Sequence, residues 1–178
     1  MGCVHDLEVC DCSCHRNKNV KHCMPCCGTC PHCRRHIRFF HLEPHIKACA
    51  GKKEDMLLKI LEPLLAVAWC RETASPGCAD AWSGGNPALG QCAVTALLVQ
   101  ELLGGELLRS IVDGHGSHYF NRLPSGRDLD LTRGQFPEGT AVPPGEPVDR
   151  ERVLRSDRAV QARTEQRYEL LKTRLASV

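Results

Sequence analysis

The segment "GQCAVTALLVQELLGGELLRSIV", residues 90–112, forms the centre of the predicted fold. Residues 91–103 are apolar on nearly all sides at helical spacing, which predicts a helix enclosed by the protein core. Gly104 and Gly105 follow, and glycine at this position is typical of a helix that ends in a left-handed turn. Residues 106–112 then predict a strand.

Two further strands are expected after this segment. The stretches "SHYFNRL" (117–123) and "RDLDLT" (127–132) have strand character, and the "PSG" between them is typical of a tight turn. Upstream, "EDMLLKILEPLLAVAWCRE" (54–72) has apolar residues at helical spacing, with Pro63 expected to kink or divide the helix. We therefore predict an α+β domain over residues 54–146, in which a buried helix packs on a small antiparallel sheet.

The regions on either side of this domain differ from it in composition. Residues 1–53 are rich in Cys, His and basic side chains and contain no long apolar period, so a metal-stabilised module is expected. The stretch "VPPGEP" (142–147) is predicted to be a stiff linker. Residues 147–178 form a charged tail, predicted as one or two helices that pack on the domain, with Ser156 or Asp157 as an N-cap.

The formal net charge of the 178-residue chain is only +2, but the charge is unevenly distributed. Residues 1–53 carry nine Lys and Arg against four Asp and Glu, residues 54–146 six against twelve, and residues 147–178 eight against five. A basic head on an acidic body suggests two units with different tasks. The sequence shows neither a secretory signal nor an apolar run of the roughly 20 residues that span a membrane. A cytoplasmic protein without a membrane partner is expected, and dense cysteines are then typical of metal sites or catalysts.

Four residues of the head have the spacing of a zinc site. The motifs "CPHC" and "HIKAC" give C-x2-C-x11-H-x3-C. Tetrahedral zinc needs four Cys or His ligands that converge, and an H-x3-C pair places two of them one helical turn apart. We expect one structural zinc ion on these four residues: Cys30, Cys33, His45 and Cys49.

A second zinc ion is allowed by the upstream stretch "CDCSCHRNKNVKHCMPCC" (10–27). It offers eight Cys and His side chains for four positions, so the assignment stays open. The preferred ligands are Cys12, Cys14 or His15, Cys26 and Cys27. The basic side chains of the head permit contacts with the phosphates of a nucleic acid, and a protein contact or a purely structural role is equally compatible with them.

Cys92 is separate from these cysteines, at the start of the apolar helix. The free N–H groups and the dipole of a helix N-terminus favour a thiolate and an oxyanion. A cysteine nucleophile also needs a base and a group that orients the base, and His118 and Asp130 follow in the next two strands. These two residues share one face of the sheet only if their hairpin loop holds an odd number of residues. A three-residue loop at 125–127 satisfies this condition, and a two-residue "SG" loop does not.

The motifs "NPALGQCAVTALLVQELLGGELLRS", "HYFNRLPSGRDLDLTRGQF" and "RYELLKTRL" resemble the YunG family of bacterial proteins, over about residues 60–176. The Gly-Gln-Cys sequence at a helix start, followed by a strand His and a strand Asp, is similar to the transglutaminase and papain-like cysteine hydrolases. This resemblance implies a papain/transglutaminase-like core with Cys92 as nucleophile, His118 as base and Asp130 as its orienting group. Gln91 or Trp82 would assist the oxyanion. Transglutaminases usually have Trp where this chain has Phe120.

The sequence therefore predicts a cysteine hydrolase or acyltransferase that acts on an amide, isopeptide or thioester bond of a protein or peptide substrate. The zinc-binding head would recruit the substrate or a partner. The alternative hypothesis is a non-enzymatic zinc-finger protein that binds nucleic acid or a protein through its basic head.

Overall fold

The structure is a computed structural model of the chain, and it describes residues 27–178 apart from the side chains of Cys27 and residues 38–40. The chain divides into two compact units, Met1–Asp55 and Met56–Val178. Their boundary lies two residues beyond the one expected from the sequence. Among the described residues, no helix combines the length and the apolar character that crossing a lipid bilayer requires.

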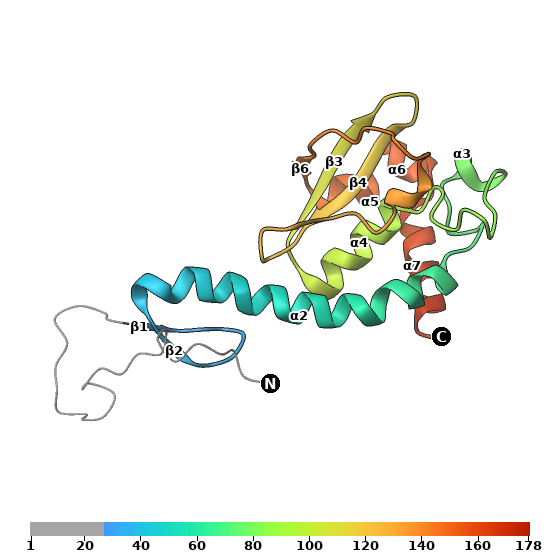
Figure 1. Cartoon of the computed structure of the whole chain (residues 1–178). Helices are drawn as coiled ribbons and strands as arrows, with labels where there is room; N and C mark the ends of the chain where they lie inside the picture. Colours follow the sequence, from blue (N-terminus) through green and yellow to red (C-terminus); the bar gives the residue numbers. More distant parts are fainter. Residues whose placement is uncertain (1–26) are drawn as a thin grey trace, which may run out of the picture. The chain divides into compact units, whose positions relative to one another are not determined.

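The described part of the first unit is a strand hairpin followed by a helix (Figure 1). Strands β1 (Cys27–Thr29) and β2 (His36–Arg38) pair in antiparallel orientation. The turn between them is closed by two backbone hydrogen bonds of 2.9 Å, from Cys30 N–H to Arg35 C=O and from Arg34 N–H to Cys30 C=O. The small core of this unit consists of three buried residues: Cys30, Ile37 and Cys49.

Helix α2 (Phe39–Ala68) begins in the first unit and ends in the second. It continues without a break through Pro63, so the expectation that Pro63 divides the helix is wrong. A proline inside a helix costs about 3 kcal/mol, because a hydrogen bond is lost and the ring crowds the preceding turn. Pro63 is exposed, however, while Leu58, Leu61 and Leu65 are buried in the core of the second unit. Burial of these leucines, at roughly 2 kcal/mol each, outweighs the cost of the proline.

The second unit contains a four-stranded antiparallel sheet in the order β5-β4-β3-β6. Strands β3 (Glu106–Val112) and β4 (Gly116–Arg122) form its central hairpin. The edges are β5 (Asp128–Leu129) and β6 (Glu146–Val148). The first three strands follow the predicted meander, although β5 is much shorter than the expected strand at 127–132. The unit therefore has the predicted α+β composition with a small antiparallel sheet.

Strand β6 includes the last two residues of the linker that was expected at residues 142–147, and residues 142–145 have no regular secondary structure. The strand pairs with residues 107–109 of β3, so this end of the segment belongs to the sheet. Pro147 lacks a backbone donor, which a strand tolerates at the edge of a sheet, where no further strand needs that donor. Two short helices lie in the connections. Helix α3 (Pro76–Ala79) lies between α2 and the helix that begins at Cys92, and η1 (Arg133–Gln135) lies between β5 and β6.

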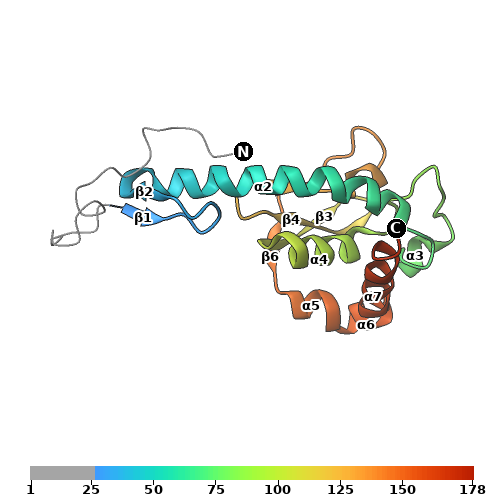
Figure 2. The ribbon, with the colours of Figure 1, turned by 90° about the horizontal axis from the view of Figure 1, so that it is seen from below.

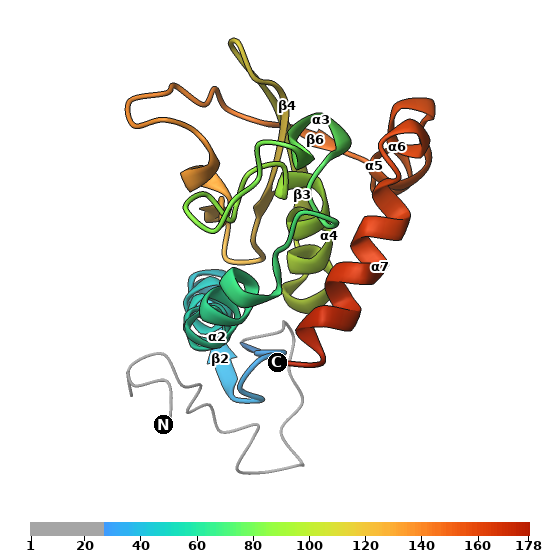
Figure 3. The ribbon, with the colours of Figure 1, turned by 90° about the vertical axis from the view of Figure 1, so that its right-hand side faces the viewer.

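Helix α4 (Cys92–Leu103) lies between the sheet and α7 (Thr164–Leu175), as Figures 1 and 3 show. Residues 94–99 of α4 are all buried, which confirms the predicted enclosure of this helix. The amide of Asn121 in β4 donates a hydrogen bond of 2.9 Å to a backbone carbonyl of α4. This bond fixes the helix against the strand that carries His118.

The charged tail folds into three helices, rather than the one or two that were predicted. The two short helices α5 (Arg150–Arg155) and α6 (Asp157–Gln161) lead into α7 (Figure 2). Ser156 caps α6, as predicted, because its side chain accepts a hydrogen bond from the backbone N–H of Ala159. Four apolar or aromatic residues of the tail join the core around α4: Val153, Leu154, Tyr168 and Leu171.

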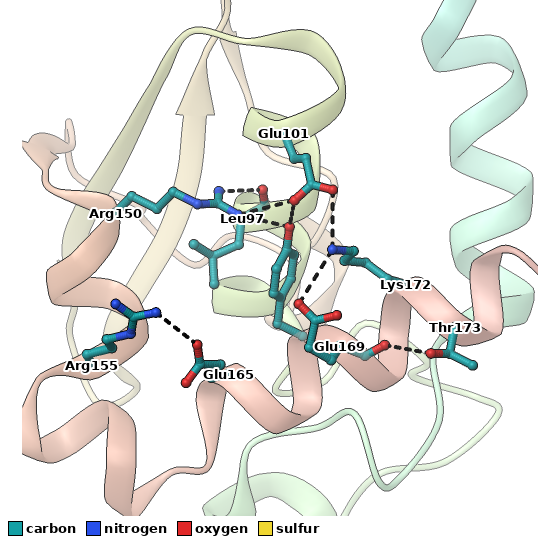
Figure 4. Close-up of polar contacts among 9 residues, drawn as sticks. Leu97, Glu101, Arg150, Arg155, Glu165, Glu169, Lys172 and Thr173 are labelled. Carbon is teal, nitrogen blue, oxygen red and sulfur yellow. Dashed lines mark hydrogen bonds and ion pairs between the residues drawn. The ribbon is translucent and has the colours of Figure 1, made fainter.

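A polar cluster also fixes the tail to α4 (Figure 4). Arg150 donates hydrogen bonds to the Leu97 carbonyl at 3.0 Å and to the Tyr168 hydroxyl at 2.8 Å. Tyr168 in turn donates to the carboxylate of Glu101, and Lys172 lies 3.4 Å from the same carboxylate. The hydrogen bond from Tyr168 is the main cause that lowers the pKa of Glu101. These contacts, between residues about 70 positions apart in the chain, thus hold α7 against α4.

Candidate functional site

Cys92 is the first residue of α4, and its free thiol is partly exposed. The chain enters the helix through Gly90, whose φ of 73° lies in the left-handed region. A Cβ atom at this position would lie 2.7 Å from the Cβ atom of Cys78 and 2.9 Å from the backbone nitrogen of Ser75, so only glycine fits. The Gly-Gln-Cys sequence therefore places a thiol at the N-terminus of a buried helix, where backbone N–H groups have no partner within the helix.

His118 and Asp130 are brought together by the sheet. His118 is only 1% exposed, and its Nε2 atom lies 2.6 Å from Asp130 Oδ2. The other oxygen of Asp130 accepts two hydrogen bonds of 3.1 Å, from the backbone N–H and the hydroxyl of Thr132. Both carboxylate oxygens are thus occupied, and the imidazole is held in one orientation.

The hairpin between β4 and β5 explains how these two side chains meet. The N–H of Leu123 donates to the carbonyl of Arg127 at 2.8 Å, which leaves a three-residue loop at 124–126. The loop holds an odd number of residues, as in the three-residue alternative left open by the sequence, but it begins one residue earlier. The register of β4 and β5, extended by one residue, places Asp130 opposite Phe120. Phe120 and His118 lie two residues apart on one face of the sheet, so Asp130 lies on the same face as His118.

Gln135 is a member of the site that the sequence analysis missed. It is buried in η1, and its Nε2 atom lies 3.1 Å from His118 Nδ1. Its Oε1 atom accepts a hydrogen bond of 3.4 Å from the N–H of Gly90, and its backbone carbonyl accepts one of 3.2 Å from Asn86. Gln135 therefore connects the base to the loop that precedes Cys92. A single glutamine in a polar stretch gives no sequence signal, because only its burial reveals this role.

The environment of His118 favours the protonated imidazole. Burial by itself lowers the pKa of His118, but hydrogen bonds with Asp130 and Cys92 outweigh burial and raise the pKa to about 9. Cys92 thus acts on the ring electrostatically, and Asp130 is the carboxylate partner of Nε2. With a pKa of about 9, the histidine carries a proton at neutral pH.

Arg167 of α7 is a second residue that the sequence analysis missed as part of the site. Its guanidinium is buried and donates to the carbonyls of Ala162 and Thr73, at 2.8 Å and 3.0 Å. Burial lowers its pKa, and the negative charge that Cys92 and Cys78 can carry opposes this effect. No carboxylate in the described part of the chain forms an ion pair with Arg167. The thiolate form of Cys92 would supply part of the charge that this buried cation lacks.

A pocket of about 370 Å³ opens beside Cys92. This volume lies within the range of small-molecule and peptide side-chain sites. Its wall includes Ser117 and Tyr119 from β4, together with Arg158 and Arg167 from the tail. The tail helices therefore contribute directly to the surroundings of the thiol.

The residues considered for oxyanion stabilisation lie in the scaffold around the thiol. Gln91 is fully buried, and its Nε2 atom donates a hydrogen bond of 2.9 Å to the carbonyl of Cys70. Its Oε1 atom has no hydrogen-bond partner among residues 27–178. The indole N–H of Trp82 donates to the carbonyl of Pro87 at 3.0 Å. The backbone N–H groups at the start of α4 are thus the donors adjacent to Cys92.

The first unit holds the cluster that the motif spacing predicted. The ligand atoms of Cys30, Cys33, His45 and Cys49 all lie within 4.8 Å of one another, and this group could hold a metal ion. The Nε2 atom of His45 lies 3.3 Å from Cys33 Sγ and 3.2 Å from Cys49 Sγ. A tetrahedral zinc ion with ordinary bond lengths separates sulfur and nitrogen ligands by about 3.5 Å. The donor set and its spacing therefore fit zinc.

The hairpin and helix α2 divide these ligands between them. The backbone turn described above brings Cys30 and Cys33 together, and the i,i+4 spacing on α2 does the same for His45 and Cys49. Of the second predicted set, Cys12, Cys14, His15 and Cys26 lie outside the described residues, as does the side chain of Cys27.

Comparison with known proteins places the second unit in a family. The family model described as YunG protein matches residues 57–178, which is more than half of the chain. A curated relative, the "Uncharacterized protein YunG" of Bacillus subtilis (strain 168), is 34% identical over 73 residues. This match covers 41% of the present chain and 57% of the relative. No solved structure matches the chain. The chain therefore belongs to the YunG family.

Proposed function

We propose that the second unit is a cysteine hydrolase or acyltransferase with a papain/transglutaminase-like core and a Cys92-His118-Asp130 triad. The observation that carries this proposal is the position of His118, which is hydrogen-bonded to Asp130 and interacts with the thiol of Cys92. Asp130 occupies Nε2, so Nδ1, which lies 3.1 Å from Gln135 Nε2, is the ring atom that exchanges a proton with the reacting groups. The substrate bond is an amide, an isopeptide or a thioester.

In the first step the Cys92 thiolate attacks the carbonyl carbon, a C–S bond forms, and the carbonyl oxygen becomes an oxyanion. The free N–H groups at the start of α4 stabilise this oxyanion. His118 then donates its proton to the leaving nitrogen or sulfur, and the bond from the carbonyl carbon to that atom breaks. An acyl-enzyme and a neutral imidazole remain.

In the second step water or an amine attacks the thioester carbon. The neutral His118 accepts a proton from this attacking molecule. The C–S bond breaks, Cys92 leaves as a thiolate, and His118 is protonated again. Asp130 keeps Nε2 protonated and so keeps Nδ1 directed at the reacting atoms. In the neutral ring, Gln135 donates to Nδ1 between the two steps, and this hydrogen bond breaks when Nδ1 accepts the proton of the entering water or amine.

For the first unit we propose a structural zinc ion on Cys30, Cys33, His45 and Cys49. Four protein ligands leave no open position for water, which is typical of a structural site. The module then recruits the substrate or a partner, and its exposed basic side chains make an acidic protein or a nucleic acid suitable. These basic residues are Arg34, Lys47, Lys52 and Lys53.

Alkylation of the zinc-loaded chain with iodoacetamide at pH 6, resolved by peptide mass spectrometry, tests the catalytic proposal. We expect Cys92 to react at least ten-fold faster than Cys70 and Cys78, which serve as internal references in the same unit. If Cys92 reacts no faster than these two cysteines, it is not an activated nucleophile. Zinc-dependent binding of nucleic acid by such a chain would then favour the non-enzymatic alternative.

A further inference from the structure

A second, smaller pocket of about 170 Å³ adjoins the pocket beside Cys92. The two share three wall residues, Tyr119, Ser156 and Arg158, and together they are called the groove of the second unit. The smaller pocket is also lined by Arg109 of β3 and Arg152 of α5. Three guanidinium groups therefore surround the end of a groove that starts at the thiol.

In the part of the chain that the structure describes, these arginines have no carboxylate partner. Arg109 donates to the hydroxyl of Ser117 from Nη2 at 2.8 Å and from Nε at 3.2 Å, and Arg158 approaches the same oxygen at 3.5 Å. Within residues 27–178, neither these two nor Arg152 forms an ion pair. Glu146 lines a neighbouring pocket with Arg109 and Arg152, but it pairs with neither. Two cations thus converge on one neutral oxygen.

Other arginines of the same helices behave differently. Arg155 pairs with Glu151 at 2.8 Å and with Glu165 at 3.3 Å, and Arg150 pairs with Glu101 at 3.4 Å. Arg152 and Arg158, which lie on α5 and α6 and line the groove, form no such pair in the described part of the chain. Like charges placed together repel each other, and an anion between them removes this cost.

We propose that Arg109, Arg158 and Ser117 bind a carboxylate of the substrate, a few bonds away from the carbonyl that Cys92 attacks. The substrate class is then an acyl compound or peptide with an acidic group next to the scissile bond. The planar guanidinium of Arg109 matches a carboxylate through two parallel hydrogen bonds, and Arg158 adds a third donor. This inference rests on the proposed function, because it assigns a role to the groove only if Cys92 is the nucleophile.

Two matched alkylating reagents test this inference on the full, zinc-loaded chain. N-bromoacetyl-β-alanine carries a carboxylate, and its primary amide has nearly the same size and no charge. We expect the acid to alkylate Cys92 at least ten-fold faster than the amide does, whereas Cys70 and Cys78 show no such preference. Arg158→Gln, at an exposed position, and Arg109→Gln should each reduce the ratio of the acid rate to the amide rate about ten-fold. Arg155→Gln is the matched control and should change neither rate.

The outcomes separate the two proposals. If both reagents alkylate Cys92 rapidly and at equal rates, carboxylate recognition is wrong while the nucleophile stands. A preference for the acid that survives both arginine substitutions also overturns the assignment to this cluster. If neither reagent selects Cys92 over the reference cysteines, the proposed function fails and the substrate class fails with it.

Discussion

Asp130 lies 2.6 Å from the Nε2 atom of His118, and its other oxygen is held by Thr132. This contact leaves Nδ1, beside Gln135, as the ring nitrogen that can exchange a proton with the thiol or the substrate. It also adds the negative charge that keeps a buried imidazole protonated. The relationship between these two residues therefore determines both the direction and the charge of the proposed base.

Asp130→Asn should reduce the rate of Cys92 alkylation at neutral pH by about 10²-fold, because the amide cannot stabilise the imidazolium. The pKa of His118 should fall below its value of about 9, since a cause that raises it is removed. The pH–rate profile reports both effects. In the wild type the rate of acyl transfer should decline as the pH rises through 9, where His118 loses the proton for the leaving group. An unchanged profile in Asp130→Asn would contradict the role of Asp130, and Asp128→Asn is the matched control on the same strand.

His118 should also make the stability of the second unit depend on pH. Its pKa is raised from 6.5 to about 9, so its contribution is fully present below pH 6.5 and is lost as the pH rises through 9. The full contribution is roughly 3 kcal/mol. Urea unfolding followed by tryptophan fluorescence can measure this, because Trp69 and Trp82 both lie in the second unit. Between pH 6 and pH 9.5 the wild type should lose more free energy of unfolding than His118→Gln. Parallel losses in the two proteins would show that His118 does not carry this linkage.

Arg167→Met should lower the alkylation rate of Cys92 at pH 6 by about ten-fold, because the thiolate loses a nearby buried cation. At pH 9, where solution hydroxide suffices to ionise a thiol, the rate should approach that of the wild type. Arg167→Lys keeps the charge but not the paired hydrogen bonds, and it should restore most of the rate at pH 6. A purely structural role would instead lower the alkylation rate of Cys92 equally at pH 6 and pH 9, and Arg167→Lys would not restore it.

Removal of one metal ligand should release one equivalent of zinc from the first unit. Elemental analysis of His45→Ala should show one zinc ion fewer per chain than the wild type. His41→Ala is the control, since His41 lies on the same helix outside the cluster. Alkylation of Cys92 should not change in either variant, because the second unit has a hydrophobic core of its own. Equal zinc content in the two variants would rule out His45 as a ligand.

The local features of this fold were predictable from the sequence, and the long-range ones were not. The apolar pattern of residues 91–103 predicted the buried helix, and strand alternation predicted that His118 and Asp130 could meet. Motif spacing was sufficient to find the cluster around His45, since its ligands come from one turn and one helix. Each of these predictions joins residues that lie fewer than 20 positions apart in the chain.

Gln135 and Arg167 reach the site from segments 43 and 75 positions beyond Cys92, and no periodicity marks them. Strand β6 was missed for a similar reason. Pro143 and Pro144 before it and Pro147 within it favour a linker, and only its pairing with β3 makes it a strand. Pro63 gave the opposite error, because the buried leucines around it stabilise a helix that the proline alone would interrupt.

Capture of an acyl-enzyme is the most direct test of the Cys92 nucleophile. The zinc-loaded chain is mixed with a thioester that carries a terminal carboxylate, quenched in acid at successive times, and analysed by intact-protein and peptide mass spectrometry. We predict an acyl adduct on the peptide of Cys92 that forms, reaches a maximum and decays as product is released, and that is absent in Cys92→Ala. Absence of the adduct in the wild type, or the same adduct in Cys92→Ala, would contradict the proposed catalytic role.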